Sequence, residues 1–196
     1  DGIDVMFAID VSKSMLAQDI KPSRLDRAKQ VLNRLIDKLD NDRIGIVIFA
    51  GKAYLQMPLT SDHSAAKMYL SAANTESVPT QGTVIGEALR ICNNSFNNKE
   101  KKYKAIVLIT DGEDHDKTAL KVTEELAASG VAIYTVGIGS SQGAPLIDET
   151  TNEVKIDNEG NAVVTKLNES ILKQIAQKAN GAYFLFNNTD AVISGI

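Results

Sequence analysis

Three polar side chains follow the first apolar run of the chain, in the stretch FAIDVSKSMLAQD. Asp10, Ser12 and Ser14 stand two residues apart, and side chains two apart in an extended segment point the same way. They are therefore able to converge on one point. A carboxylate with two hydroxyl groups offers hard oxygen ligands without nitrogen or sulfur, which favours Mg²⁺, Mn²⁺ or Ca²⁺ over zinc or copper. The stretch thus predicts a candidate metal site.

Two further polar residues occupy comparable positions later in the chain. Thr83 stands at the expected start of a helix in GTVIGEAL, and Asp111 directly follows the apolar run KAIVLIT. Ligands of open α/β sheets bind beyond the carboxyl ends of the strands. We therefore expect Thr83 and Asp111 to complete the ligand set begun by Asp10, Ser12 and Ser14.

A simpler interpretation is open at this point. Asp10 could make a turn while Ser12 and Ser14 cap the next helix. The spacing of the three residues does not distinguish this interpretation from metal binding. It accounts less well for Thr83 and Asp111, which occur at other junctions between a strand and a helix.

Hydrophobic patterning indicates the elements that must position these residues. Four nearly continuous apolar runs, rich in Val and Ile, are typical of strands that helices cover on both faces. They span residues 3–10, 43–50, 104–111 and 131–139, and a shorter run spans 181–187. Residues 52–60 alternate apolar and polar side chains, which predicts an antiparallel edge strand.

Amphipathic helical patterns fill the intervals between these runs, with apolar side chains at three- and four-residue spacing. They span residues 23–39, 61–73, 83–96, 117–130 and 169–181. Ser23 is placed to cap the first helix, and Gly130 and Gly181 are placed as left-handed C-terminal caps. Strands that alternate with helices imply right-handed crossovers. We therefore predict an α/β fold with a doubly wound, mostly parallel sheet.

Residues 140–168 interrupt this alternation of strands and helices. The segment EVKIDNEGNAVVTKL predicts a β-hairpin that turns at Asn158–Gly160. We therefore expect a single domain over residues 1–196, with 140–168 as a hairpin insertion rather than a second domain. The length of 196 residues suits one α/β domain.

Composition narrows the classes of function. The net charge is −4, from 21 basic and 25 acidic side chains, so the basic footprint of a nucleic-acid-binding protein is missing. Cys92 is the single cysteine, which excludes an intrachain disulfide and a cysteine-based metal site. No apolar stretch reaches the roughly 18 residues that suggest a membrane-spanning helix. We expect membrane attachment, if any, to come from segments outside this chain.

Taken together, the motifs resemble von Willebrand factor A-type (VWA) domains. DVSKS, GTVIGEAL and ITDGED match in order the three parts of that family's metal-ion-dependent adhesion site (MIDAS), and the similarity covers essentially the whole chain. The resemblance implies a Rossmann-like VWA fold in which Ser12, Ser14 and Thr83 are hydroxyl ligands of Mg²⁺, with Mn²⁺ or Ca²⁺ as alternatives. Asp10 and Asp111 would act directly or through water. It also implies an interaction module, not an enzyme, whose cation binds a carboxylate of a protein partner.

Within that family, the stretches DVMFAIDVSKSM, SRLDRAKQ, RIGIVIFAG and NEGNAVVTKL are most similar to the bacterial aerotolerance-operon membrane proteins of the Bat type. The similarity implies that the domain is cut from a longer, membrane-anchored chain, lies on the periplasmic side, and is linked to oxygen or stress tolerance. Sister VWA proteins of the same operon and a MoxR-type ATPase are the partners it implies.

Two alternatives to a metal-dependent interaction module are retained. In the first, Asp10 is the phosphoryl-accepting nucleophile of a Mg²⁺-dependent hydrolase. Haloacid-dehalogenase-type phosphatases need a second aspartate two residues on, where this chain has Ser12. In the second, the domain is a scaffold whose metal is purely structural. An adhesion-type site should leave one coordination position exposed, whereas a structural site should be closed by protein ligands.

Overall fold

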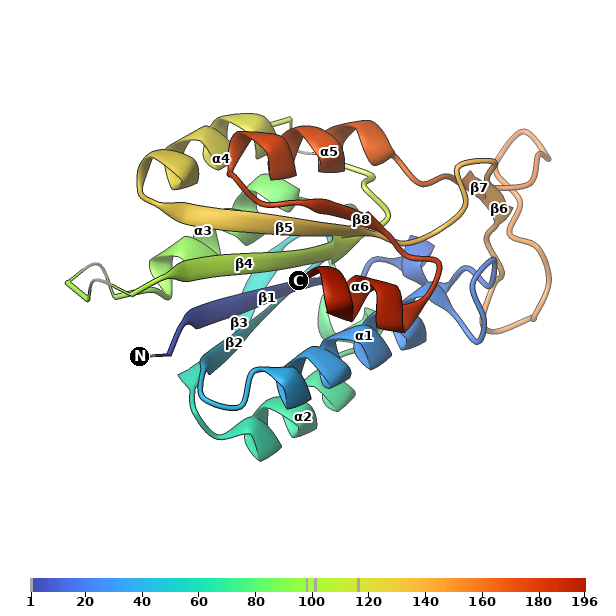
Figure 1. The fold of residues 1–196 in the computed structure, drawn as a ribbon. Helices are drawn as coiled ribbons and strands as arrows, with labels where there is room; N and C mark the ends of the chain where they lie inside the picture. Colours follow the sequence, from blue (N-terminus) through green and yellow to red (C-terminus); the bar gives the residue numbers. More distant parts are fainter. Residues whose placement is uncertain (1, 98, 101, 116) are drawn as a thin grey trace.

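A six-stranded sheet, ordered β3-β2-β1-β4-β5-β8, lies at the centre of the fold (Figure 1). The computed structural model describes residues 2–97, 99–100, 102–115 and 117–196. The strands are β1 (Asp4–Asp10), β2 (Arg43–Phe49), β3 (Ala53–Thr60), β4 (Lys104–Thr110), β5 (Val131–Gly137) and β8 (Tyr183–Leu185). Neighbouring strands are parallel, except that β3 pairs antiparallel with β2 at the edge. The predicted fold class and the antiparallel edge strand are confirmed.

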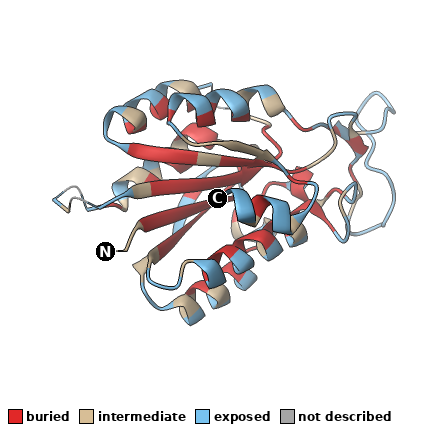
Figure 2. Ribbon diagram, viewed as in Figure 1, coloured by how far each residue is buried: buried red, intermediate tan, exposed pale blue. Residues whose placement is uncertain are grey.

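Helices cover both faces of this sheet (Figure 1). One face carries α1 (Arg24–Lys38), α2 (His63–Ala72) and α6 (Thr189–Gly195), and the other carries α3 (Ile85–Asn94), α4 (Ala119–Ala128) and α5 (Glu169–Lys178). Figure 2 shows that the strands between the two layers are largely buried, while the outer sides of the helices are exposed.

The alternation of side chains along a strand produces the two halves of the core. In β1, Phe7 and Ile9 belong to the apolar cluster on the α1 face, whereas Met6 and Ala8 belong to the cluster on the α3 face. All four side chains are completely buried. A strand that is buried on both faces needs apolar residues at every position, and this explains the continuous apolar runs in the sequence.

The five predicted helices are confirmed, and the Ser23 hydroxyl accepts a hydrogen bond from the Asp26 amide at the start of α1. Helix α6 and the 3₁₀ helices η1 (Lys13–Leu16) and η2 (Thr75–Ser77) were not predicted. They are too short to show a helical period; α6 buries only Val192.

Among the described residues, no helix combines the length and apolar composition that crossing a membrane requires.

The two predicted glycine caps differ in outcome. Gly130 after α4 adopts a left-handed conformation with φ of 82°, as predicted. The prediction for Gly181 is wrong, because Asn180 adopts the left-handed conformation after α5, with φ of 56°. Gly181 instead permits a close approach of two backbones, since a Cβ atom there would lie 1.8 Å from the carbonyl oxygen of Ile133 in β5.

The insertion between β5 and α5 lies beyond the carboxyl ends of the parallel strands (Figure 1). Its short strands β6 (Ala144–Pro145) and β7 (Val164–Thr165) pair antiparallel. Within the predicted hairpin, Ile156 and Ala162 form an antiparallel bridge, and Gly160 lies in the turn, where its amide donates to Asp157 O at 3.1 Å. The predicted hairpin is therefore confirmed. The segment also contains an earlier turn, which is closed by the antiparallel bridge between Ile147 and Val154.

Candidate metal centre

The candidate site lies where two neighbouring strands end. Asp10 is the last residue of β1, and Asp111 directly follows β4, which pairs with β1. The chain fills the sheet on one side of β1 with β2 and β3, and then crosses to the other side with β4. This change of direction is the switch point at which open α/β sheets bind their ligands.

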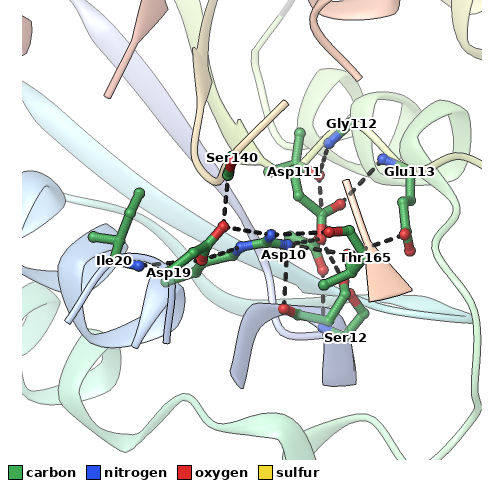
Figure 3. Close-up of polar contacts among 12 residues, drawn as sticks. Asp10, Ser12, Asp19, Ile20, Asp111, Gly112, Glu113, Ser140 and Thr165 are labelled. Carbon is green, nitrogen blue, oxygen red and sulfur yellow. Dashed lines mark hydrogen bonds and ion pairs between the residues drawn. The ribbon is translucent and has the colours of Figure 1, made fainter. Parts of the chain in front are cut away.

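Asp10 is completely buried and connects the two strands. One of its carboxylate oxygens accepts the Ser12 amide at 2.8 Å, and the other accepts the Thr110 hydroxyl of β4 at 2.7 Å (Figure 3). The contact with Ser12 is the turn that the simpler interpretation assigned to Asp10. The carboxylate has a second role that the turn does not explain, because it also fixes the end of β4 relative to β1.

The two serine side chains do not cap the helix that follows. Ser12 stands at the N-cap of η1, but its hydroxyl makes no capping hydrogen bond. Its Oγ atom instead lies 3.0 Å from Oγ of Ser14, and the Ser14 hydroxyl donates to Asp111. The structure thus brings the hydroxyl groups of Ser12 and Ser14 together with the carboxylate of Asp111.

Asp111 is also completely buried, and both of its carboxylate oxygens accept hydrogen bonds. Oδ1 accepts the Glu113 amide at 3.1 Å, and Oδ2 accepts Nη1 of Arg24 at 3.2 Å in addition to the Ser14 hydroxyl. The next residue, Gly112, has φ of 79°, and a Cβ atom there would lie 2.3 Å from the carbonyl oxygen of Asn168. Only glycine allows the chain to turn so closely after Asp111.

Thr83 reaches the site from the loop before α3. It is 1% exposed, and its amide donates to Nδ1 of His115 at 2.9 Å, while the His115 amide donates to Thr83 O at 2.8 Å. His115 is exposed, and these two hydrogen bonds position the Thr83 backbone. Thr83, Ser12 and Ser14 all line one cavity of about 160 Å³.

Arg24 is a member of the site that the sequence patterns did not identify. It is completely buried, and its guanidinium binds Asp19 through Nε at 2.9 Å and Nη2 at 2.8 Å, Asp111 through Nη1, and the Thr165 hydroxyl at 3.1 Å (Figure 3). The one available signal is its place in the first turn of α1. A cation there opposes the helix dipole, which indicates a stabilising partner outside the helix.

The site concentrates negative charge away from water. Burial raises the pKa of Asp10, against the hydrogen bonds from Ser12 and Thr110. Burial and then the charge of Asp10 raise the pKa of Asp111 to about 7, against the hydrogen bond from Ser14. The ion pair with Arg24 also favours the charged form of Asp111. A divalent cation would relieve the same repulsion between the two carboxylates.

The donor atoms suit a hard cation. The five candidate residues offer only carboxylate and hydroxyl oxygens, which are the ligands that Mg²⁺, Mn²⁺ and Ca²⁺ prefer. Within the described part of the chain, no group of three or more His, Cys, Asp or Glu side chains is placed to hold a metal. The serine and threonine hydroxyls would therefore supply part of the ligand set of a cation at these strand ends.

Comparison with known families agrees with the arrangement of these elements. The family described as von Willebrand factor type A domain matches residues 5–113, which include all five candidate residues. The chain belongs to this family. It is 41% identical to BatB from Bacteroides thetaiotaomicron, with a TM-score of 0.94 over 99% of this chain and 97% of that one.

The chain is also similar to other bacterial proteins. An aerotolerance-related membrane protein from Bacteroides fragilis is 41% identical, with a TM-score of 0.95 over 100% of this chain and 96% of that one. The predicted similarity to Bat-type VWA domains is therefore confirmed. An uncharacterised protein from Borreliella burgdorferi is 28% identical over 95% of this chain but only 54% of its own length. The chain spans about half the length of the curated relatives it matches.

The first prediction concerns the buried arginine. Arg24→Met leaves Asp111 and Asp19 without their ion-pair partner, so we expect it to lower the free energy of unfolding by about 3–5 kcal/mol in urea denaturation. Arg34→Met is the matched control, because Arg34 pairs with Asp190 at the surface and should contribute at most about 1 kcal/mol. Equal losses in the two variants would contradict the proposed importance of the buried pair.

The second prediction concerns pH. A carboxyl group whose pKa is raised by folding binds more protons in the folded than in the unfolded state between its two pKa values. Because the pKa of Asp111 is raised from 3.8 to about 7, its contribution should stabilise the metal-free protein as the pH falls from about 7.5 to about 5. For one carboxyl group, the slope is at most about 1.4 kcal/mol per pH unit.

Asp111→Asn removes this contribution. The effect of Asp19 on stability has the opposite sign, because folding lowers the pKa of this carboxyl. Burial alone would raise that pKa, but the hydrogen bond and the charge of Arg24 outweigh the effect of burial. We therefore compare the free energy of unfolding of the wild type and of Asp111→Asn across this pH range in the presence of a chelator. The prediction is wrong if the wild type does not gain stability relative to the variant as the pH falls.

Proposed function

We propose that this VWA domain binds a divalent cation, Mg²⁺ in the first instance, and uses it to bind an acidic side chain of a protein partner. The hydroxyls of Ser12, Ser14 and Thr83 hold the cation, and Asp10 and Asp111 act directly or through water. The observation that carries the proposal is that three hydroxyl-bearing residues line one cavity beside two buried carboxylates. The bound cation would supply a positive charge that a carboxylate recognises.

The shape of the site supports recognition rather than a purely structural role for the metal. The cavity over Ser12, Ser14 and Thr83 is about 160 Å³, whereas a single water molecule needs about 10–15 Å³. Exposed side chains, among them Lys13 and Lys155, form part of its wall. The three hydroxyl-bearing residues therefore face a cavity that opens to the surface, as a site that receives a partner's carboxylate requires.

The environment of Asp10 supports an interaction module over a hydrolase. A nucleophilic carboxylate must reach its substrate, but both oxygens of Asp10 accept hydrogen bonds and the residue is 0% exposed. We accordingly expect no turnover in a screen of generic phosphate esters with Mg²⁺. Turnover that disappears in Asp10→Ala would favour the hydrolase instead.

The relatives suggest the setting in which this module acts. BatB and the aerotolerance-related membrane protein support a role in a membrane-anchored bacterial protein. We propose that the domain faces the periplasm, that its function is linked to oxygen or stress tolerance, and that its partners are sister VWA proteins or a MoxR-type ATPase. The activity of the whole protein is part of this proposal, since the chain spans about half of its curated relatives.

Calorimetry tests the cation site directly. We expect Mg²⁺ and Mn²⁺ to release or absorb heat on binding to the wild type, and Ser12→Ala to weaken their affinity by about tenfold or more, as the loss of a metal-site contact commonly does. Ser64→Ala is the matched control, because Ser64 is exposed on α2. Equal heats from wild type and Ser12→Ala, or none from either, would overturn the metal proposal.

A pull-down from bacterial membranes tests the interaction. We expect a protein partner to be recovered with Mg²⁺, to be lost when a chelator is added, and to be lost with Thr83→Ala even in Mg²⁺. The Ser64→Ala variant should recover the same partner as the wild type. Recovery that is indifferent to the chelator would argue against recognition through a cation.

A further inference from the structure

The insertion forms one wall of the cavity above the candidate metal centre. Thr83 and His115 line one part of the cavity, and Ser12 and Ser14 line another. The residues that the insertion contributes to the lining are Leu146, Lys155, Val163, Val164 and Thr165. A partner side chain that enters the cavity must therefore contact the insertion as well as the cation ligands.

Hydrogen bonds hold this wall in a fixed position relative to the site. The Thr165 hydroxyl donates to Glu113 at 3.1 Å and accepts from Nη1 of Arg24, which also binds Asp111 (Figure 3). The backbone amide of Asn168, just after β7, donates to Asp111 O at 2.8 Å. The insertion is thus connected to the residue beside the cation position, which suits a surface that selects a ligand.

The entrance of the cavity carries two positively charged side chains. Lys13 of η1 and Lys155 of the insertion are exposed and line the cavity. Among the described residues, neither ammonium group makes a hydrogen bond or an ion pair, although the pKa of the Asp148 carboxyl is lowered by backbone hydrogen bonds and, to a lesser degree, by the charge of Lys155. Glu113 is the carboxylate in the lining, and it accepts the Thr165 hydroxyl. Two ammonium groups disfavour a bare cation nearby and favour an anionic occupant.

A second hollow shares part of this lining and adds two acidic side chains. Its volume is about 140 Å³, and it shares Lys13, Leu146 and Lys155 with the first cavity. Asp148 and Glu149 line it. A ligand that extends from the first cavity into the second therefore meets two carboxylates in addition to the two lysines. Asp148 and Glu149 would repel further acidic residues of that ligand.

We propose that the insertion is the specificity-determining element of the site and selects a partner segment with a single acidic side chain. Lys13 and Lys155 attract that carboxylate to the cation, while Asp148 and Glu149 reject segments with further acidic residues. The inference rests on the proposed function for the contact between carboxylate and cation. It adds the class of partner: an extended peptide segment whose one carboxylate is followed by uncharged or basic residues.

Fluorescence polarisation with three synthetic peptides tests the inference at low ionic strength. The probes are alanine-rich nonapeptides, acetylated and amidated, that carry one central aspartate, one asparagine in its place, or three consecutive aspartates. Each is titrated with the wild type, the Lys13→Ala/Lys155→Ala double variant, the Asp148→Asn/Glu149→Gln double variant, and the control Lys121→Ala. Lys121 is an exposed lysine on α4, away from the cavity lining.

We expect the single-aspartate peptide to bind the wild type in Mg²⁺ more tightly than the other two peptides do. The lysine double variant should weaken this binding by roughly two- to fivefold per lysine, the range of an exposed charge pair, whereas Lys121→Ala should not. The affinity of the lysine double variant for Mg²⁺ alone should be unchanged or higher, and a general loss of structure would not produce that result. The Asp148→Asn/Glu149→Gln variant should improve binding of the triple-aspartate peptide above all.

The outcomes separate this inference from the proposed function. Binding that a chelator abolishes but the lysine double variant does not weaken would overturn the inference and leave the cation site supported. Binding that depends on the lysines but is indifferent to the chelator would contradict the proposed function and, with it, the part of the inference that directs the carboxylate to a cation. No measurable binding of the single-aspartate peptide, or equal binding of the triple-aspartate peptide, would overturn the inference.

Discussion

The burial of two carboxylates at adjacent strand ends is the constraint on which the site depends. An ionised carboxylate that leaves water needs partners for its oxygens and for its charge, or it costs several kcal/mol. Asp10 obtains its partners from Ser12 and Thr110, and Asp111 obtains them from Ser14, Glu113 and Arg24. The turns after β1 and β4 take the conformations that supply these donors. The residues proposed to hold a cation therefore also hold the loops in place.

The parallel sheet brings Asp10 and Asp111 close together. Because β1 and β4 are parallel neighbours in matched register, from Asp4 opposite Lys104 to Ile9 opposite Ile109, their carboxyl ends lie side by side. Both strands are buried between helices, so the positions of Asp10 and Asp111 are fixed by a rigid core rather than by the loops. The insertion lies at the same end of the sheet, where it lines the cavity beside these residues.

Much of the fold and part of the site could be predicted from the sequence. Strands and helices have local periods, and the family motifs include all five candidate residues, from Asp10 to Asp111. The prediction that Gly181 caps α5 was wrong because glycine occurs both at left-handed helix caps and where two backbones approach closely. Its backbone proximity to Ile133 depends on the packing of α5 against β5, which no local pattern records. No pattern in the sequence around His115 indicates its contact with Thr83, because the two residues are 32 positions apart.

The sequence by itself determined the family, the alternation of strands and helices, and the polar residues at the strand ends, since each is written in spacing over a few residues. Only the tertiary structure decided that Arg24 neutralises Asp111 and that the insertion lines the cavity. Those contacts join residues 87 positions apart for Arg24 and Asp111, and 141 apart for Arg24 and Thr165. A buried arginine has no periodic pattern to distinguish it from an exposed one, because its role is set by partners that the fold brings from distant segments.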